Sequence, residues 1–314
     1  MTLVQPNPEM QLRIRSELNE DVSTRDDDLQ HIKEWLTRQP HLPKFDDDSR
    51  IMTFLRGCKF SREKCKRKLD MYFTMRTAAP EFFANRDPTS PEIKDVMRLA
   101  YLPPLPGVTP DGRRVCIFRA ATNNVEEFDL PSVHNGMKVV MMIGDIRLKE
   151  ESTGVAGDVY ILDAAIATPA NFAAHFSKFT PALVKKFFVC VQEGYPVKVK
   201  EVHVVNASPL VDTIINFVKP FIKEKIRNRI HVHSDGFETL YKYVPKEMLP
   251  EEYGGNAGPV SKINEDWIKK MESYKEWFAE QENVKADESK RPGKPKTHDD
   301  LFGMEGSFRQ LSID

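Results

Sequence analysis

Short β-branched runs alternate with helix-like segments from about residue 95 onwards. The runs that read as strands are VCIF at 115–118, DVYILD at 158–163, EVHVVN at 201–206 and IHVH at 230–233. Segments with helical spacing of apolar residues lie between them, at 132–149, 180–192 and 210–229. Strands that alternate with helices pair in parallel, so this order predicts an α/β fold with a mainly parallel sheet covered by helices.

Residues before about 95 read as a helical domain. Three helix starts, near Thr24, Asp46 and Ser61, each combine a capping or acidic residue with apolar residues that follow at helical spacing. We therefore divide the chain into a helical domain (1–94), an α/β domain (95–257), an amphipathic helix (258–283) and a tail (284–314). We expect the tail to be flexible, because KADESKRPGKPKTHDD is charged and almost devoid of apolar residues.

Charge and cysteine content exclude some classes of protein. The net charge is −1, from 46 Lys and Arg against 47 Asp and Glu, which argues against a nucleic-acid-binding protein. The first residues lack the apolar core of a secretory signal, and no apolar run approaches the roughly 20 residues of a membrane span. The scattered cysteines favour buried or half-buried thiols in a reducing compartment. They are Cys58, Cys65, Cys116 and Cys190. We expect a soluble cytoplasmic protein.

The signatures of common enzyme classes are absent from the sequence, which has no GxGxxG after a strand, no GxxxxGK, no GxSxG and no HExxH. His231 and His233 share a face of the predicted strand, but two ligands do not make a metal site. We interpret them as histidines that are hydrogen-bonded near a strand end. Asp163 ends an apolar strand and reads as a cap or turn residue. We expect no catalytic residues, no metal and no cofactor.

Two segments carry more apolar residues than docking on a sheet requires. They are 172–191, which is rich in phenylalanine, and 210–222, LVDTIINFVKPFI. Two interpretations stay open for each segment. Either the segment is a core helix buried on two sides, or one of its faces lines a cavity while the other packs against the protein.

Basic residues are concentrated in two blocks. Residues 56–76 hold eight Lys or Arg against two acids, a local charge of +6, and residues 184–230 hold nine against four, a local charge of +5. On an ideal helix, Lys225 and Arg229 fall nearer the apolar face than the other basic residues, so this segment bends or faces a polar ligand. A solvated face is the default interpretation. Near an anionic membrane, each such residue adds about 1 kcal/mol of attraction.

An ordered series of motifs resembles one family. The motifs are FLRGCKF (54–60), DGRRVCIFR (111–119), TPALVKK (180–186), YPVKVKEVHVVN (195–206), FVKPFIKEKIRNRIHVHS (217–234) and LPEEYGG (249–255). Together they resemble the CRAL-TRIO lipid-transfer family, and within it the branch of the alpha-tocopherol transfer protein and cellular retinaldehyde-binding protein.

This resemblance implies a helical N-terminal domain and a CRAL-TRIO α/β/α domain, whose mixed, largely parallel sheet encloses an apolar ligand cavity under a gate helix. By position, the cavity residues are Leu162, Phe179, Phe187, Cys190, Val191, Tyr195, Val202, Ile214 and Phe217. The gate helix carries Leu210, Val211, Ile214, Ile215, Phe217, Val218 and Phe221.

A basic groove beside the gate, which binds phosphoinositide headgroups, is also implied by the resemblance. Its positions are Arg56, Lys198, Lys200, Lys225 and Arg229. Convergence of these side chains on one phosphate cluster explains the unusual placement of Lys225 and Arg229. The hypothesis is that the groove triggers gate opening and cargo release at a membrane.

The polar end of the cavity departs from the tocopherol carrier. Val140 and Gly144 stand where that carrier has serines, and the segment 164–179 is longer. Tocopherol, retinoids, carotenoids, sterol-like terpenoids and a phosphoinositide therefore all remain open as cargo.

Three functions follow from these observations. The first is a soluble intracellular carrier that moves one hydrophobic small molecule between membranes and is transiently at their surfaces. The second is a phosphoinositide-dependent membrane adaptor without cargo, and the third is an α/β enzyme that acts on a lipid. The expected partners are the hydrophobic ligand, phosphoinositides and the membrane surface, with no nucleic acid. We expect a monomer.

Overall fold

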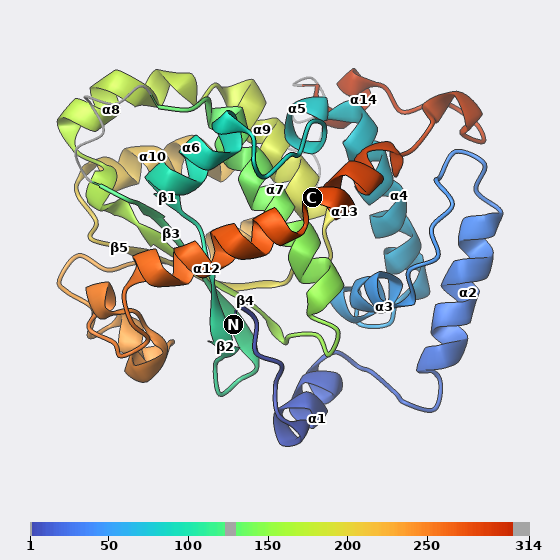
Figure 1. The fold of residues 1–314 in the computed structure, drawn as a ribbon, viewed down its shortest axis with the longest axis horizontal. Coiled ribbons are helices and arrows are strands. Elements are labelled where there is room, and N and C mark those ends of the chain that lie inside the picture. Colours follow the sequence, from blue (N-terminus) through green and yellow to red (C-terminus); the bar gives the residue numbers. More distant parts are fainter. Residues whose placement is uncertain (1, 123–129, 304–314) are drawn as a thin grey trace, which may run out of the picture.

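A six-stranded mixed sheet forms the centre of the structure (Figure 1), a computed structural model that describes residues 2–122 and 130–303. The strands are β1 (Ala100–Tyr101), β2 (Pro104–Val108), β3 (Arg113–Ala120), β4 (Gly157–Asp163), β5 (Val199–Val205) and β6 (Ile230–Val232). Strands β3, β4, β5 and β6 are parallel neighbours, and β1 and β2 pair antiparallel with β3. The predicted fold class, with its mixed, largely parallel sheet, is confirmed.

One face of the sheet forms the main hydrophobic core. Val115, Val159 and Val205 lie on this face and are fully buried. They pack in one cluster with α7 (Val133–Glu150) and α12 (Val260–Ser273), the second of which contributes the buried Trp267. A break at Tyr274 separates α12 from α13 (Lys275–Glu280), so the helix predicted at 258–283 is divided in two. In Figure 1, α12 crosses in front of α7.

The helical domain lies beside the sheet, to the right in Figure 1. It contains α2 (Arg25–Thr37), α3 (Asp48–Gly57), α4 (Arg62–Ala78) and α5 (Pro80–Phe83), and α6 (Pro91–Leu99) leads from it into β1. Aromatic side chains fill its core, where the rings of Phe54 and Phe73 each lie edge-on to Tyr72. The core also includes Met141 and Leu148 of α7, so the two domains share a continuous buried interface.

Four further helices connect β4 to β5 and β5 to β6: α8 (Pro169–His175), α9 (Pro181–Val189), α10 (Leu210–Val218) and α11 (Glu224–Arg227). The segment predicted as one helix at 210–229 is bent. A 3₁₀ turn at Lys219–Phe221 separates α10 from α11, because Pro220 has no N–H for the helical hydrogen-bond ladder. The bend that the placement of Lys225 and Arg229 suggested is therefore present.

The first residues of the chain pack on the α/β domain rather than on the helical domain to which the sequence assigned them. Leu3 joins the main core, and the backbone N–H of Val4 donates to the carbonyl of Pro106 at 2.8 Å. Helix α1 (Pro8–Glu17) follows, and Ile14 and Leu18 form a small buried cluster with Ala156.

The segment 284–303 packs against the helical domain, so the expectation of a flexible tail is wrong for these residues. Ala286 and Phe302, which ends α14 (His298–Phe302), are buried in the helical-domain core. Arg291 and Lys296 contact the Asp70 carboxylate at 2.8 and 2.6 Å. Two apolar anchors and these ion pairs compensate for the polar composition. Residues 304–314 of the predicted tail lie outside the described residues.

Candidate functional site

Apolar side chains of β3, β4 and β5 share the second face of the sheet. Tyr160 pairs in register with Cys116 on one side and Val202 on the other, and Phe118 pairs with Leu162. Four of the five are only half-buried, in contrast to the first face. A cavity of about 60 Å³ lies over this face and is lined mainly by apolar residues of β3, β4, α7 and 191–197.

Helix α10 turns its apolar side inward. Every apolar residue predicted for the gate helix is buried or half-buried, whereas Asp212, Thr213 and Asn216 on its other side are exposed. The Phe217 ring lies 5.1 Å from the Phe176 ring, which stacks at 4.2 Å on Phe172 of α8. Aromatic contacts with the α8 segment therefore hold α10 in place.

Four of the residues predicted for the ligand pocket line the cavity or share its sheet face, and two lie on the apolar side of α10. Val191 and Tyr195 line the 60 Å³ cavity. Leu162 and Val202 lie on the same sheet face, and Ile214 and Phe217 are half-buried on α10.

The other three predicted pocket residues do not line this cavity of about 60 Å³. The Phe187 ring contacts Phe82 of the helical domain, with 6.1 Å between ring centroids. Cys190 is fully buried in the helical-domain core, and burial raises the pKa of its thiol to about 12. Phe179, at the turn before α9, is 42% exposed.

Further lining residues were missed by the sequence interpretation. Phe118, Tyr160 and Met141 all line the cavity. The alternation in DVYILD could have identified Tyr160, because residues two apart on a strand share a face with Leu162. Val140 and Gly144, the positions without serines, also line the cavity. A Cβ atom at Gly144 would lie 3.3 Å from the Tyr195 ring.

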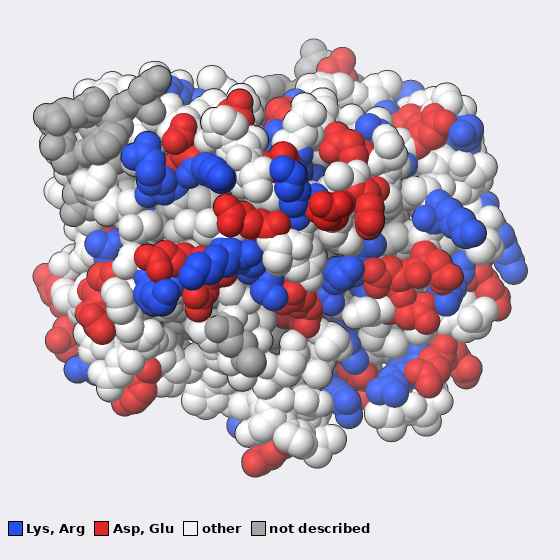
Figure 2. All heavy atoms as spheres, in the orientation of Figure 1, with Lys and Arg blue, Asp and Glu red and all other residues white. Residues whose placement is uncertain are grey.

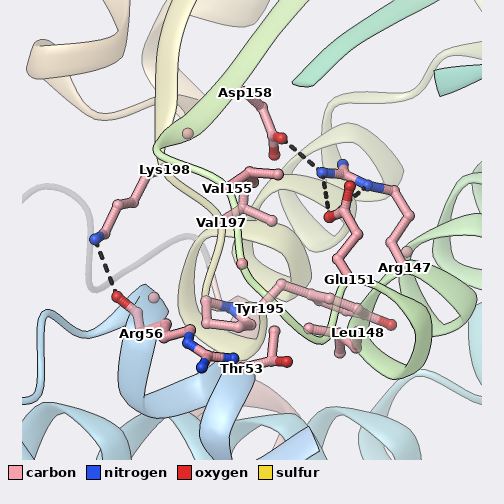
Figure 3. Close-up of a pocket in the computed structure, with 15 residues that line it drawn as sticks. Thr53, Arg56, Arg147, Leu148, Glu151, Val155, Asp158, Tyr195, Val197 and Lys198 are labelled. Atoms are coloured by element: carbon pink, nitrogen blue, oxygen red, sulfur yellow. Dashed lines mark hydrogen bonds and ion pairs between the residues drawn. The ribbon is translucent and has the colours of Figure 1, made fainter. Parts of the chain in front are cut away.

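A second cavity, of about 70 Å³, adjoins the first and is more polar (Figure 3). Gly144, Arg147, Tyr195 and Val197 line both cavities. The Arg147 guanidinium donates to Glu151 at 2.8 Å and to Asp158 at 2.7 Å. Burial raises the pKa of Asp158 above its usual value despite this ion pair. Arg147 is thus tied to protein carboxylates at the junction of the two cavities.

Four of the five predicted phosphoinositide residues lie along this polar cavity and the adjoining ends of the strands. Arg56 and Lys198 line the cavity, and the Lys198 ammonium donates to the Arg56 carbonyl at 3.1 Å. Burial, together with nearby Lys59 and Lys200, lowers the pKa of Lys198 to about 8. Arg229 donates to the carbonyl of Val199, between the two predicted lysines. Lys225 lies exposed on α11, which packs on β5.

The Arg56 guanidinium is already paired within the protein. It donates to both carboxylate oxygens of Glu20, at 2.8 and 2.9 Å, and to the carbonyl of Ser152. Arg56 therefore belongs to a buried internal ion pair, whereas Lys200 pairs with the half-exposed Glu17.

The remaining polar residues that the sequence singled out have hydrogen-bond partners. His231 shares a hydrogen bond with Glu201 at 2.8 Å, and His233 shares one with His203 at 3.0 Å. Asp163 caps the turn after β4 by accepting from Ala165 N–H, as predicted. All four cysteines are buried free thiols, also as predicted. Within residues 2–122 and 130–303 there is no group of three or more His, Cys, Asp or Glu suited to a metal ion.

In the described part of the chain, none of the helices combines the length and hydropathy needed to cross a membrane. Figure 2 shows acidic and basic side chains interspersed over the face viewed there.

Comparisons with known proteins match the same regions. A model described as "Pinta-like, UBA domain" matches residues 21–93, and the CRAL/TRIO domain model matches residues 101–255. Alpha-tocopherol transfer protein-like from Mus musculus is 31% identical over 249 residues, 79% of this chain and 70% of the relative. Clavesin-2 from Rattus norvegicus is 27% identical over 255 residues, 81% of this chain and 76% of the relative. The crystal structure of Sfh5 superposes with a TM-score of 0.46 and 14% identity, over 85% of this chain and 98% of that chain.

The CRAL/TRIO match spans strands β2 to β6 and helix α10, and the identity to the mouse relative extends over most of both chains. This chain therefore belongs to the CRAL/TRIO domain family.

Proposed function

We propose that this protein binds one hydrophobic small molecule and transfers it between membranes. The observation that supports this most directly is the apolar side of α10, which is turned into the protein and contacts Phe176 through the Phe217 ring. Enclosing roughly 400 Å² of apolar ligand surface contributes about 10 kcal/mol, which suffices to withdraw a lipid from a bilayer without covalent chemistry. The mouse relative's name also includes transfer of a tocopherol.

Entry of such a ligand requires α10 to move. The cavity of about 60 Å³ is smaller than a lipid, since about 10–15 Å³ of such volume is needed to hold a single water. The bend at Lys219–Phe221 separates α10 from the chain that continues to β6. We propose that α10 swings outward about this bend, while β6 and the basic groove stay in place.

The cavity favours a cargo with few polar groups. Val140 and Gly144 offer no polar side-chain atom, and the Tyr195 hydroxyl already donates to Asp145 at 2.8 Å. Arg147 is tied to Glu151 and Asp158. Carotenoids, retinoids and terpenoids with a large apolar part fit this lining better than ligands that need several hydrogen bonds.

Membrane docking is proposed for the basic groove, through phosphoinositide headgroups at Lys198, Lys200 and Arg229. Charge reversal in the double variant Lys198→Glu, Arg229→Glu should weaken binding to phosphatidylcholine vesicles that contain phosphatidylinositol bisphosphate. The control, Lys262→Glu with Lys269→Glu on exposed α12 positions, makes the same change in net charge. Unchanged vesicle binding by the groove variant would sink this part of the proposal.

Extraction of the bound ligand tests the carrier itself. The protein is incubated with cell lipids and repurified, and its organic extract is analysed by mass spectrometry. A stoichiometric apolar molecule is the expected result. Phosphoinositide as the sole ligand would instead favour the membrane adaptor without cargo. The small size of the cavity is the observation that favours this alternative. A chemically altered lipid would favour an enzyme.

A further inference from the structure

Helix α1 ends beside the proposed phosphoinositide groove. The segment 2–20 is attached to the α/β domain by Leu3 in the core and by Ile14 and Leu18 against Ala156. These contacts place the last residue of α1, Glu17, over the start of β5.

Glu17 lies between two lysines from distant parts of the chain. Its carboxylate accepts a hydrogen bond from Lys200 at 2.9 Å and forms an ion pair with Lys59 at 3.5 Å. These two lysines hold the pKa of Glu17 below its usual value. Lys59 follows α3 in the left-handed region, with φ of 53°. Lys59 and Lys200 thus form a two-lysine anion site that a carboxylate of the same chain occupies.

The position of Glu17 on its own helix is unfavourable. It is the last residue of α1, where the carbonyl end of the helix dipole repels negative charge. Its side chain is 42% exposed, and the Lys200 and Lys59 side chains are 22% and 45% exposed. A solvent-accessible ion pair of this kind is weak, so a stronger anion can replace the carboxylate.

The neighbouring Glu20 behaves differently. It is fully buried and held by the two-point contact with Arg56 described above. Glu20 therefore anchors the segment after α1 to α3, and Glu17 is the acid that can leave its partners while the segment stays attached.

We propose that Lys59 and Lys200 form a phosphate subsite of the basic groove and that Glu17 occupies it until a membrane lipid phosphate takes its place. This inference rests on the proposed phosphoinositide binding. A phosphate monoester carries more charge than a carboxylate and has three acceptor oxygens. It can therefore accept from Lys59 and Lys200 together, with Lys198 close by. Lys59 becomes a headgroup ligand in addition to the residues that the family resemblance implied.

The consequence is selectivity for headgroups with several phosphates. A zwitterionic lipid must compete with Glu17 for the lysines, whereas a bisphosphorylated inositol brings enough charge to displace it. The protein then remains weakly attached to ordinary bilayers and docks where phosphoinositides are present.

The test compares Glu17→Gln with Glu9→Gln, an exposed acid in the first turn of the same helix. Both variants lose one negative charge, but only the first one frees the subsite. Binding to phosphatidylcholine vesicles with phosphatidylinositol bisphosphate is measured by sedimentation. We expect about two- to fivefold tighter binding for Glu17→Gln, the range of an exposed ion pair, and no change for Glu9→Gln. In the Glu17→Gln background, Lys59→Gln should reverse the gain.

Equal binding by the two glutamine variants would overturn the inference. The groove variant Lys198→Glu, Arg229→Glu separates this result from failure of the proposed function. If the groove variant binds poorly while the two glutamine variants bind alike, only the proposed role of Glu17 is refuted. If the groove variant binds as well as the unaltered chain does, the proposal that the groove binds phosphoinositides is refuted. Soluble inositol trisphosphate provides a second arm, and a gain for Glu17→Gln there without one on vesicles would overturn the assignment to a membrane lipid.

Discussion

Asp145 of α7 and Arg76 of α4 form an ion pair that joins the two domains, with 2.5 Å between carboxylate oxygen and guanidinium nitrogen. Arg86 donates to the same oxygen at 2.6 Å, and the Tyr195 hydroxyl donates to the other at 2.8 Å. Burial alone would raise the pKa of Asp145, but the two arginines hold it below its usual value. Tyr195 also lines the apolar cavity, so this ion pair positions part of the cavity wall.

Replacement of this carboxylate should be strongly destabilising. Asp145→Asn leaves two buried guanidinium groups without a counter-charge, which costs about 3–5 kcal/mol in free energy of unfolding. Urea denaturation measures this difference. Asp95→Asn is the matched control, because Asp95 is 56% exposed and lies 3.6 Å from exposed Arg98. A loss of under about 1 kcal/mol for Asp145→Asn would contradict the role given to this pair.

The attachment of the segment 284–303 should depend on pH. Burial raises the pKa of Asp70, but hydrogen bonds from Arg291, Lys296 and His41 outweigh it and lower the pKa to about 2. The pKa of Asp70 is lower in the folded than in the unfolded chain. The ionised carboxylate therefore stabilises the fold above about pH 4, and this stabilisation is lost as the pH falls towards 2. Asp70→Asn should therefore lose about 2 kcal/mol of stability at pH 7.

Denaturation of the unaltered chain and Asp70→Asn from pH 7 to pH 3 checks this expectation. The difference in free energy of unfolding between the unaltered chain and Asp70→Asn should become smaller below about pH 4. Asp235→Asn, at an exposed loop position, provides the control and should match the unaltered chain throughout. A constant difference across the range would show that the carboxylate charge is not what holds the segment.

Membrane binding through Lys198 should weaken in mild alkali. Its pKa of about 8 means that Lys198 loses its charge between pH 7 and pH 9. A lysine near an anionic surface contributes about 1 kcal/mol, so vesicle affinity should fall by about fivefold. Headgroup phosphates gain charge with a pKa of about 6 and act in the opposite direction. Lys198→Gln should remove the fall in affinity between pH 7 and pH 9, whereas Lys225→Gln should retain it. A similar fall in vesicle affinity for Lys198→Gln would show that another group causes the pH dependence.

Loosening the gate should speed release of an apolar ligand. Phe217→Ala removes the ring contacts with Phe176 and Phe221. An aromatic pair contributes about 0.5–1.5 kcal/mol beyond buried area, which corresponds to release faster by about 2- to 12-fold. Stopped-flow fluorescence of bound diphenylhexatriene measures the release rate. Asn216→Ala, on the exposed side of α10, should leave the rate unchanged. Equal rates for the two variants would mean that α10 does not control release.

The fold could be predicted because its signals are local. Runs such as DVYILD alternate in side-chain direction, and β4 forms at 157–163 with Tyr160 and Leu162 on one face. The positions of Phe187 and Cys190 could not be predicted in the same way. The segment 181–194 carries apolar residues on more than one of its sides. Sequence alone does not show which side packs against the helical domain. The attachment of 284–303 depends on pairs such as Arg291 with Asp70, whose separation of 221 residues leaves no local pattern.

The packing of Ala286 and Phe302 also affects how the chain folds during its synthesis. Both residues belong to the core built by α2, α3 and α4, yet they emerge from the ribosome after the whole α/β domain. Domains generally fold as units in the order of synthesis. Here the first domain to emerge keeps an open apolar site until the last described segment arrives. Completion of the helical domain is thereby coupled to translation of the entire lipid-binding domain.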